Sequence, residues 1–466
     1  MSSQTLPTPQ EIVEAGLSAA GGIKGCVVIV TCTAIANVRW ARTTLTTNGE
    51  TFSVSTAVVA VVDVDGGTAA GSVTGQVNSI EDVGQLVANA VDAARQAGPA
   101  DDAADLPDAL TTMDWALPAG LATSDELASV TPALGEIFVQ ARLDEIEHFG
   151  YAEQAVITTY VGTSTGTRAR FEGPEARLEL TAKSHGRSRS AWAGRSGRRL
   201  NELDVAGADI ELRQGLVWQG TRIEIEPGRH TAVLSPSATA DLIIDLYWSS
   251  MARDAAEGRS VWSTAGGGTR IGDVVADTRV TLSSDPSWTG MEAIPFATAV
   301  ASSAASIVFD NGLPLHPITW IQQGVLRNLI STRSTAAEAK VPLAIAIDNL
   351  RMDIEGAHGS TADVIARVQD GLLITCLWYN RVVDAQTLLL TGLTRDGVYV
   401  IRDGKVIGAA TNFRFNDSPV DVLTRVIDAG DTVPTLAREF GDYFNRAAMP
   451  TLVVKDYNFS TVSQAN

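Results

Sequence analysis

Apolar and polar side chains alternate with period two between residues 153 and 195, most clearly in residues 176–183. One set of side chains there is apolar (Leu178, Leu180 and Ala182) and the intervening set is charged or polar. Because successive side chains of a strand point to opposite faces, this pattern predicts strands with one buried and one solvated face. β-branched runs at residues 26–33, 38–44 and 51–64 predict further strands. The first half of the chain is therefore expected to build an antiparallel sheet.

Helices are predicted beside these strands. Residues 8–20 place apolar side chains near one helical face, and Ser79 begins a second helix with an acidic residue three positions later. Pro132 is suited to the first turn of a third helix, which we expect to end at Glu147. Residues 201–213 are compatible with a fourth.

The second half opens with a helix and continues as short strands. Ser235 is a good N-cap and Pro236 fits the first helical position, so we expect a helix that closes at Gly258. Further on, Asp403-Gly404 between two apolar runs predicts a hairpin. For 466 residues, we predict an α+β fold in two domains: a mixed α/β domain with an antiparallel sheet (residues 1–220) and a β-rich domain (residues 221–466).

Charge and cysteine content restrict the function classes. Lys and Arg number 35 against 54 Asp and Glu, a net charge of −19, so a phosphate backbone would be repelled and nucleic acid is not expected as a partner. Three cysteines without a CxxC pair predict a reducing compartment. We see no secretory signal and no membrane span, and we expect a cytoplasmic, soluble protein.

No catalytic constellation is visible in the sequence. The five histidines are widely separated, and neither an HExxH nor a Gly-x-Ser-x-Gly motif occurs. The calcium-like start at residues 63–67 lacks its acidic twelfth position, which is Thr74, and is better interpreted as a turn. The arginine-rich stretch from Ser184 to Arg199, with Trp192 inside it, could be a basic strip for an anionic partner, but we interpret it as a solvated strand face. Cys376 is interpreted as a buried packing residue.

Several stretches together resemble one protein family. They are Ala36-Asn37-Val38-Arg39-Trp40-Ala41, Pro227 to Pro236 (PGRHTAVLSP), Glu257-Gly258-Arg259-Ser260, Gly324-Val325-Leu326, Gly371 to Tyr379 (GLLITCLWY) and Gly392 to Gly397 (GLTRDG). In this order they are similar to the TldD/PmbA family, also called TldD/TldE or "modulator of DNA gyrase" proteins. The resemblance implies a mixed N-terminal domain followed by a β-rich C-terminal domain.

The resemblance also bears on metal binding. In this family the TldD-type subunit is a metalloprotease whose zinc is held by a helical HExxxH motif and a late cysteine, whereas the TldE/PmbA-type subunit lacks these ligands. The two histidine positions correspond to about Ile243 and Trp248, the glutamate to about Ile244, and no cysteine follows Cys376. The resemblance is thus to the TldE-like subunit, with no catalytic residue, no metal ligand and no cofactor in this chain.

The function implied is that of a non-catalytic, metal-free subunit of a TldD/TldE-type heterodimeric metalloprotease acting on peptides or unfolded segments. Its expected partner is a TldD-like protein that bears HExxxH and the zinc, and a homodimer is expected when the chain is alone. Trp248, Arg259 and Trp378 lie in or beside the family-like segments and are candidates for lining the shared cavity. Two alternatives stay open: a subunit recruited to maturation of a peptide-like or amide natural product, and a stand-alone peptide-binding protein without proteolysis.

Overall fold

The first part of the chain forms one long antiparallel sheet. The computed structural model describes residues 6–463. The sheet has the strand order β3-β2-β1-β4-β5-β6. Its strands are β1 (Gly25–Ala41), β2 (Thr44–Val64), β3 (Gly67–Gly75), β4 (Glu147–Thr163), β5 (Arg168–Ser184) and β6 (Arg189–Gly197). The period-two pattern therefore predicted strands correctly, and residues 174–184 of β5 alternate buried and half-buried side chains. The second face was expected to be solvated and is half-buried instead.

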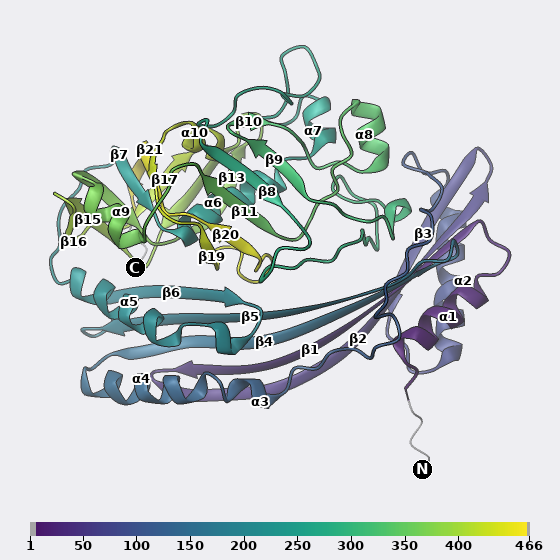
Figure 1. The fold of residues 1–466 in the computed structure, drawn as a ribbon, viewed down its shortest axis with the longest axis horizontal. Helices are drawn as coiled ribbons and strands as arrows, with labels where there is room; N and C mark the ends of the chain where they lie inside the picture. The colour runs from purple at the N-terminus through teal and green to yellow at the C-terminus, as the bar shows by residue number, and fades with distance from the viewer. Residues whose placement is uncertain (1–5, 464–466) are drawn as a thin grey trace.

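Helices cover one end and one face of this sheet (Figure 1). They are α1 (Pro9–Ala19), α2 (Ile80–Ala97), α3 (Ser124–Leu127), α4 (Thr131–Leu143) and α5 (Val205–Trp218), with a short 3-10 turn, η1 (Leu200–Glu202). The helix predicted from Ser79 begins there, because the Ser79 hydroxyl accepts from the Asp82 N–H while the Asp82 carboxylate accepts from the Ser79 N–H. Apolar side chains of α4 and α5 pack in a common core with those of β1 and β5.

The remainder of the chain is rich in strands and lies on the opposite face of the sheet from α3 and α4 (Figure 1). One sheet has the order β10-β9-β8-β11-β20-β19, and a nine-stranded sheet has the order β13-β14-β17-β21-β7-β12-β15-β16 with β18 paired to β21. The first contains β8 (Val280–Ser284), β9 (Ile318–Gln322), β10 (Val325–Leu326), β11 (Leu350–Ile354), β19 (Val433–Thr435) and β20 (Ala447–Met449). The second contains β7 (Gly228–Leu234), β12 (Asp370–Ile374), β13 (Leu377–Asp384), β14 (Leu389–Thr394), β15 (Val398–Arg402), β16 (Lys405–Ala409), β17 (Phe413–Asp417), β18 (Val426–Ala429) and β21 (Leu452–Val462).

Short helices connect these strands, and the predicted fold class is confirmed. The helices are α6 (Pro236–Trp248), α7 (Ala252–Ala256), α8 (Arg333–Ala339), α9 (Thr361–Arg367) and α10 (Pro419–Thr424), with a 3-10 turn, η2 (Val308–Asp310). An antiparallel mixed region is followed by a β-rich one, which is the α+β arrangement expected. The predicted division at residues 220 and 221 stays a prediction. No helix within residues 6–463 combines the length and apolarity needed to cross a bilayer.

Two predicted helix ends differ from the structure. The helix expected to run from Ser235 to Gly258 ends at Trp248, because the Ser250 hydroxyl donates to the Leu246 carbonyl (2.7 Å) and Met251 is extended, so that α7 is separate. The helix expected to reach Glu147 ends at Leu143, because Glu145 adopts a left-handed conformation (φ 54°) that reverses the chain.

Ion pairs join the β-rich part to the long sheet through residues 436–446. The Arg438 Nη1 donates to Glu179 Oε2 (2.9 Å), Arg177 pairs with Asp442, and Arg446 pairs with Glu175. The acidic and basic partners on the sheet all belong to β5, whose polar face is therefore covered rather than solvated. The 436–446 segment is therefore one of the connections between the two parts, in addition to the core that Phe296 and Phe309 share with β1 and β2.

Candidate functional site

Helix α6 carries the positions where the resemblance places metal ligands, and it does not fit a metal. Ile243 and Ile244 are buried in the large core of the β-rich part. Trp248, at the end of the helix, is 36% exposed, and its ring meets Phe440 at 4.9 Å and Phe444 at 6.0 Å between centroids. Hydrocarbon and indole side chains offer zinc no lone pair, whereas His, Cys and carboxylate do. Within residues 6–463, no three such side chains gather so that they could hold a metal ion.

The polar centre of α6 is Asp241. Its buried carboxylate accepts from the N–H groups of Leu377 (2.8 Å) and Glu439 (2.9 Å), and its own carbonyl accepts from Asn380 Nδ2 (2.8 Å). Burial raises the pKa of Asp241 to about 8, although the two N–H donors act in the opposite direction. Asp241 therefore fastens the 436–446 segment and the start of β13 to α6.

One helical turn further, Asp245 adds a second carboxyl group. Burial raises the pKa of Asp245 to about 7, and the nearby charge of Glu439 adds to that shift while Asn380 opposes it. The Glu439 carboxylate itself accepts from the Tyr379 N–H (2.8 Å) and from Arg381 Nη1 (3.3 Å). The buried Oδ2 of Asp245 and Oδ1 of Asn380 make no hydrogen bond in the described structure. Two acids whose pKa values are raised to about 8 and about 7 thus lie near a third carboxylate, that of Glu439.

Arg438 links this site to the long sheet. Its guanidinium lies 4.9 Å from the ring centroids of both Trp192, on β6, and Trp378, on β13. It also contacts Glu179, as described above, and lies 3.9 Å from the Asp396 carboxylate. A cation held between two indoles and two carboxylates is well ordered and partly desolvated. Trp192, the aromatic residue of the arginine-rich strip, is thus buried and not part of a solvated face.

The structure brings two of the three predicted cavity residues to one segment. Trp248 contacts Phe440 and Phe444, and Trp378 contacts Arg438, all within residues 436–446. Arg259 lies elsewhere, after α7, with its half-exposed side chain paired to Asp254 (2.7 Å) and Glu257. Whether these residues line a shared cavity stays a prediction.

Sequence reasoning missed Asp241, Asp245 and Glu439. The available signal was two acids spaced four residues apart in an otherwise apolar helix, since a charged residue on a buried face needs dedicated partners. Cys376 was interpreted correctly as a packing residue: it is fully buried, and burial raises the pKa of its thiol well above the ordinary value.

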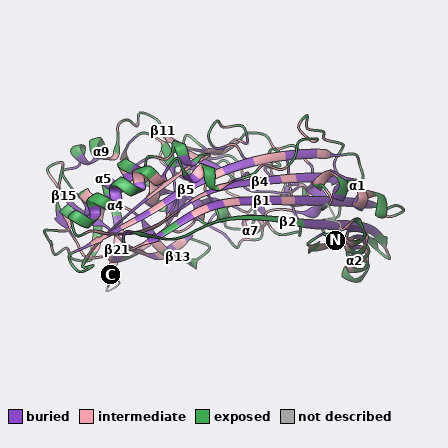
Figure 2. Ribbon diagram, turned by 90° about the horizontal axis from the view of Figure 1, so that it is seen from below, coloured by how far each residue is buried: buried purple, intermediate pink, exposed green. Residues whose placement is uncertain are grey.

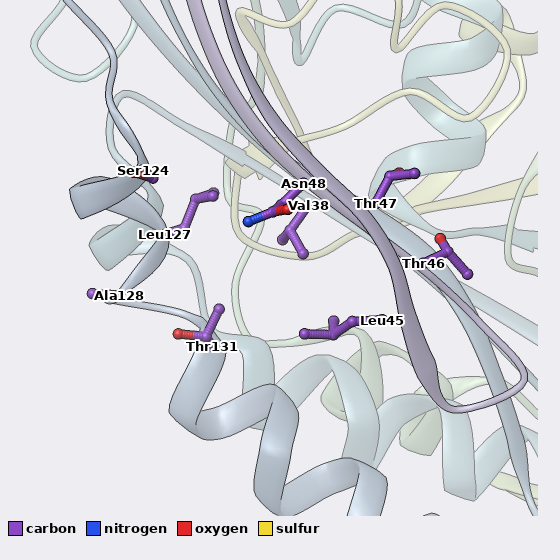
Figure 3. A pocket seen from close by; sticks show the side chains of 9 residues that line it. All are labelled: Val38, Leu45, Thr46, Thr47, Asn48, Ser124, Leu127, Ala128 and Thr131. Carbon is purple, nitrogen blue, oxygen red and sulfur yellow. The ribbon is translucent and has the colours of Figure 1, made fainter.

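A separate hollow of about 410 Å³ lies on the long sheet (Figure 3), and its lining includes neither the acids of α6 nor the 436–446 segment. It lies between the hairpin end of β1 and β2 and the helices α3 and α4. Its lining residues are Val38, Leu45, Thr46, Thr47, Asn48, Ser124, Leu127, Ala128 and Thr131. None of them carries a charge.

Comparisons with known proteins agree with this architecture. Residues 227–461 match the model of the PmbA/TldA metallopeptidase C-terminal domain. The chain is similar in fold to TldE from Thermococcus kodakarensis (TM-score 0.74, 15% identity, covering 96% of this chain and 99% of that chain). It is also similar to putative modulators of DNA gyrase from Bacteroides thetaiotaomicron (0.73, 15%, 97% and 99%) and Thermotoga maritima (0.75, 14%, 97% and 100%).

At the level of sequence, no curated protein matches the chain. The solved structures, at 14–15% identity, establish the fold. The family model covers just over half of the residues, including α6, β13 and the 436–446 segment that meet at Asp241. The chain therefore belongs to the PmbA/TldD family of metallopeptidase-like proteins.

Proposed function

We propose that this chain is the non-catalytic, metal-free subunit of a TldD/TldE-type heterodimeric metalloprotease that acts on peptides or unfolded segments. The observation that carries the proposal is the burial of Ile243 and Ile244 in the core, at the positions where a catalytic subunit would present the first histidine and the glutamate. A buried isoleucine can neither bind zinc nor activate water.

The contacts of α6 support the same role. Asp241 uses both carboxylate oxygens to hold backbone N–H groups, and Trp248 packs against Phe440 and Phe444. These residues keep the helix covered by the chain's own 436–446 segment. In the proposed complex, the partner's HExxxH helix and cysteine hold the zinc, which would polarise a peptide carbonyl and activate water there. This chain would contribute shape and surface.

Trp248, Arg259 and Trp378 are proposed to line the cavity shared with the partner. Trp248 and Arg259 both retain exposed surface that a partner would cover, with 55% of the Arg259 side chain accessible. Replacing each by alanine should raise the KM of the complex for peptides without abolishing kcat. Unchanged kinetics in all three variants would remove them from the cavity.

The proposal is tested by reconstitution. The chain is expressed with and without a candidate HExxxH-bearing partner, and zinc in each purified subunit is measured by mass spectrometry. We expect one zinc in the partner, less than about a tenth of a zinc in this chain, and peptide cleavage only by the mixture. A partner Glu→Gln variant in HExxxH should abolish cleavage while complex formation persists.

Two results would contradict the proposal. Stoichiometric zinc with peptide cleavage by this chain alone would make it an enzyme. Failure to associate with the HExxxH-bearing protein, combined with tight binding of peptides that are never cleaved, would favour the stand-alone binding function.

A further inference from the structure

The first half of β2 is an open edge of the long sheet. Residues 44–61 of β2 pair with β1, but β3 first pairs with β2 at Thr56. On the side away from β1, residues 44–55 pair with no strand in the described part of the chain. Figure 2 shows this stretch along the margin of the sheet, coloured as exposed. Its outward N–H and C=O groups are thus available to another chain.

This edge lacks the devices that normally prevent pairing. Residues 44–53 are exposed throughout, and residues 44–55 contain neither lysine nor proline and a single charged residue, Glu50. Leu45 and Phe52 are 52% and 54% exposed. Natural sheets usually protect a long edge with charges, proline or a covering segment. An unprotected edge of this length is a template for an added strand.

A pocket for side chains lies directly beside the edge. The hollow of about 410 Å³ has Leu45, Thr46, Thr47 and Asn48 of the edge on one side and α3 and α4 on the other (Figure 3). Val38 and Leu127 contribute apolar surface. Peptides that add to a sheet edge bind through main-chain hydrogen bonds and gain specificity from pockets for alternate side chains. The volume suits one or two aliphatic side chains.

We propose that residues 44–55 of β2 bind an extended peptide segment as a seventh strand, with an aliphatic side chain in the hollow and a basic residue near Glu50. Glu50 accepts a hydrogen bond from the Ser124 N–H (2.5 Å), and hydrogen bonds from Ser124 lower the pKa of its carboxyl, so it is charged at neutral pH. With the net charge of −19, this favours a basic segment over an acidic one.

The same charges argue against a second copy of the chain as the occupant. Two-fold antiparallel pairing centred on Gly49 would place the two Glu50 residues as diagonal neighbours, about 7–8 Å apart on one face of the sheet, and each copy carries a net charge of −19. This peptide-binding site goes beyond the proposed function, since it requires neither zinc nor a catalytic partner.

The test uses the full chain and a defined probe: a blocked, fluorescently labelled heptapeptide of alternating valine and threonine with lysine at each end. Fluorescence anisotropy should show saturable binding. Two further peptides carry N-methyl groups on the backbone, one at the odd-numbered and one at the even-numbered residues. One of the two should bind at least about tenfold more weakly than the parent peptide, because only one set of N–H groups donates to the sheet edge. Glutamate in place of lysine should also weaken it several-fold at low salt.

Matched protein variants locate the site. Ala128 lines the hollow at an exposed position, so Ala128→Trp should fill the hollow and weaken binding of the probe at least about tenfold. Ala97 is also exposed but lies at the end of α2, so Ala97→Trp should leave binding of the probe unchanged. Thermal melting checks that both variants are folded.

Three results of the peptide-binding experiments would overturn the proposal. They are no saturable binding of the probe, equal binding of both N-methylated sets and the parent peptide, or equal binding by the Ala128→Trp variant. Sedimentation velocity could instead show that the chain is a dimer. If Phe52→Lys dissociated this dimer and the matched edge-strand variant Ile407→Lys did not, the edge would be a self-association surface. That result would also overturn the proposal.

Discussion

Replacing Asp245 by asparagine should stabilise the protein increasingly as the pH rises from 5 to 8. Burial raises the pKa of Asp245 from 3.8 to about 7 in the folded protein. Between these values the folded state binds a proton that the unfolded state has lost, so the free energy of unfolding of the wild type decreases as the pH rises. Above about pH 7 both states are ionised, and the loss is complete.

The magnitude follows from the width of that window. Each pH unit within it changes the free energy of unfolding by about 1.4 kcal/mol, so the two units from pH 5 to pH 7 set an upper limit of about 3 kcal/mol. Asp245 is only half-buried, and relaxation and water access reduce the effect, so we expect about 1–2 kcal/mol. Asparagine keeps the size of the side chain and carries no charge at any of these pH values.

Guanidinium unfolding followed by tryptophan fluorescence at pH 5, 6, 7 and 8 measures the difference between Asp245→Asn and wild type. The control is Asp92→Asn, because 66% of the Asp92 side chain is exposed. The difference in free energy of unfolding between Asp92→Asn and the wild type should be the same at all four pH values. A stability advantage of Asp245→Asn that stays constant or shrinks as the pH rises would show that the pKa of Asp245 is not raised in the folded protein.

Three further predictions concern contacts seen in the structure. Asp241→Ala leaves two buried N–H donors, those of Leu377 and Glu439, without an acceptor, so urea unfolding should show a loss of about 1–3 kcal/mol. An unchanged midpoint would contradict the role of Asp241 in fastening these segments. Arg438→Met removes the contacts of the guanidinium with Trp192 and Trp378 and its hydrogen bond to Glu179. In the same assay it should lower the free energy of unfolding by about 1–3 kcal/mol. A loss below about 0.5 kcal/mol would mean that these contacts do not stabilise the fold. Gly71→Ala would place a Cβ 2.1 Å from the Ala94 nitrogen of α2, so it should lower the free energy of unfolding by about 2 kcal/mol or more. At Gly49 a Cβ meets nothing within 4 Å, so Gly49→Ala should change the free energy of unfolding by less than about 1 kcal/mol. Equal effects of the two variants would contradict the close packing of α2 on β3.

Local signals in the sequence predicted the elements well. The alternation in residues 176–183 and the cap at Ser79 depend on neighbours within one strand or one turn, and both were confirmed. The helix end at Leu143 was missed because the left-handed residue that follows it, Glu145, is not a glycine and gives no clear sequence signal. The strand order also has no local signature, since β1 pairs with β4 although two strands and three helices lie between them in the chain.

The candidate site was harder to predict because its partners are distant in sequence. Asp241 accepts from Glu439, 198 residues later, and Arg438 reaches Glu179 across 259 residues. Composition and periodicity cannot specify such pairs. The ion pairs of β5 show the same limit, since its polar face looked solvated in the sequence and is covered by the 436–446 segment.

Helix α6 has Ile243, Ile244 and Trp248 where the family resemblance places zinc ligands and the catalytic glutamate, and none of the three can bind a metal. The most direct test of this is equilibrium dialysis of the isolated chain against zinc, followed by determination of bound metal per chain. We predict no binding tighter than the millimolar range and no change on replacing Trp248 by alanine. One zinc per chain held at micromolar or lower free concentration would contradict the account.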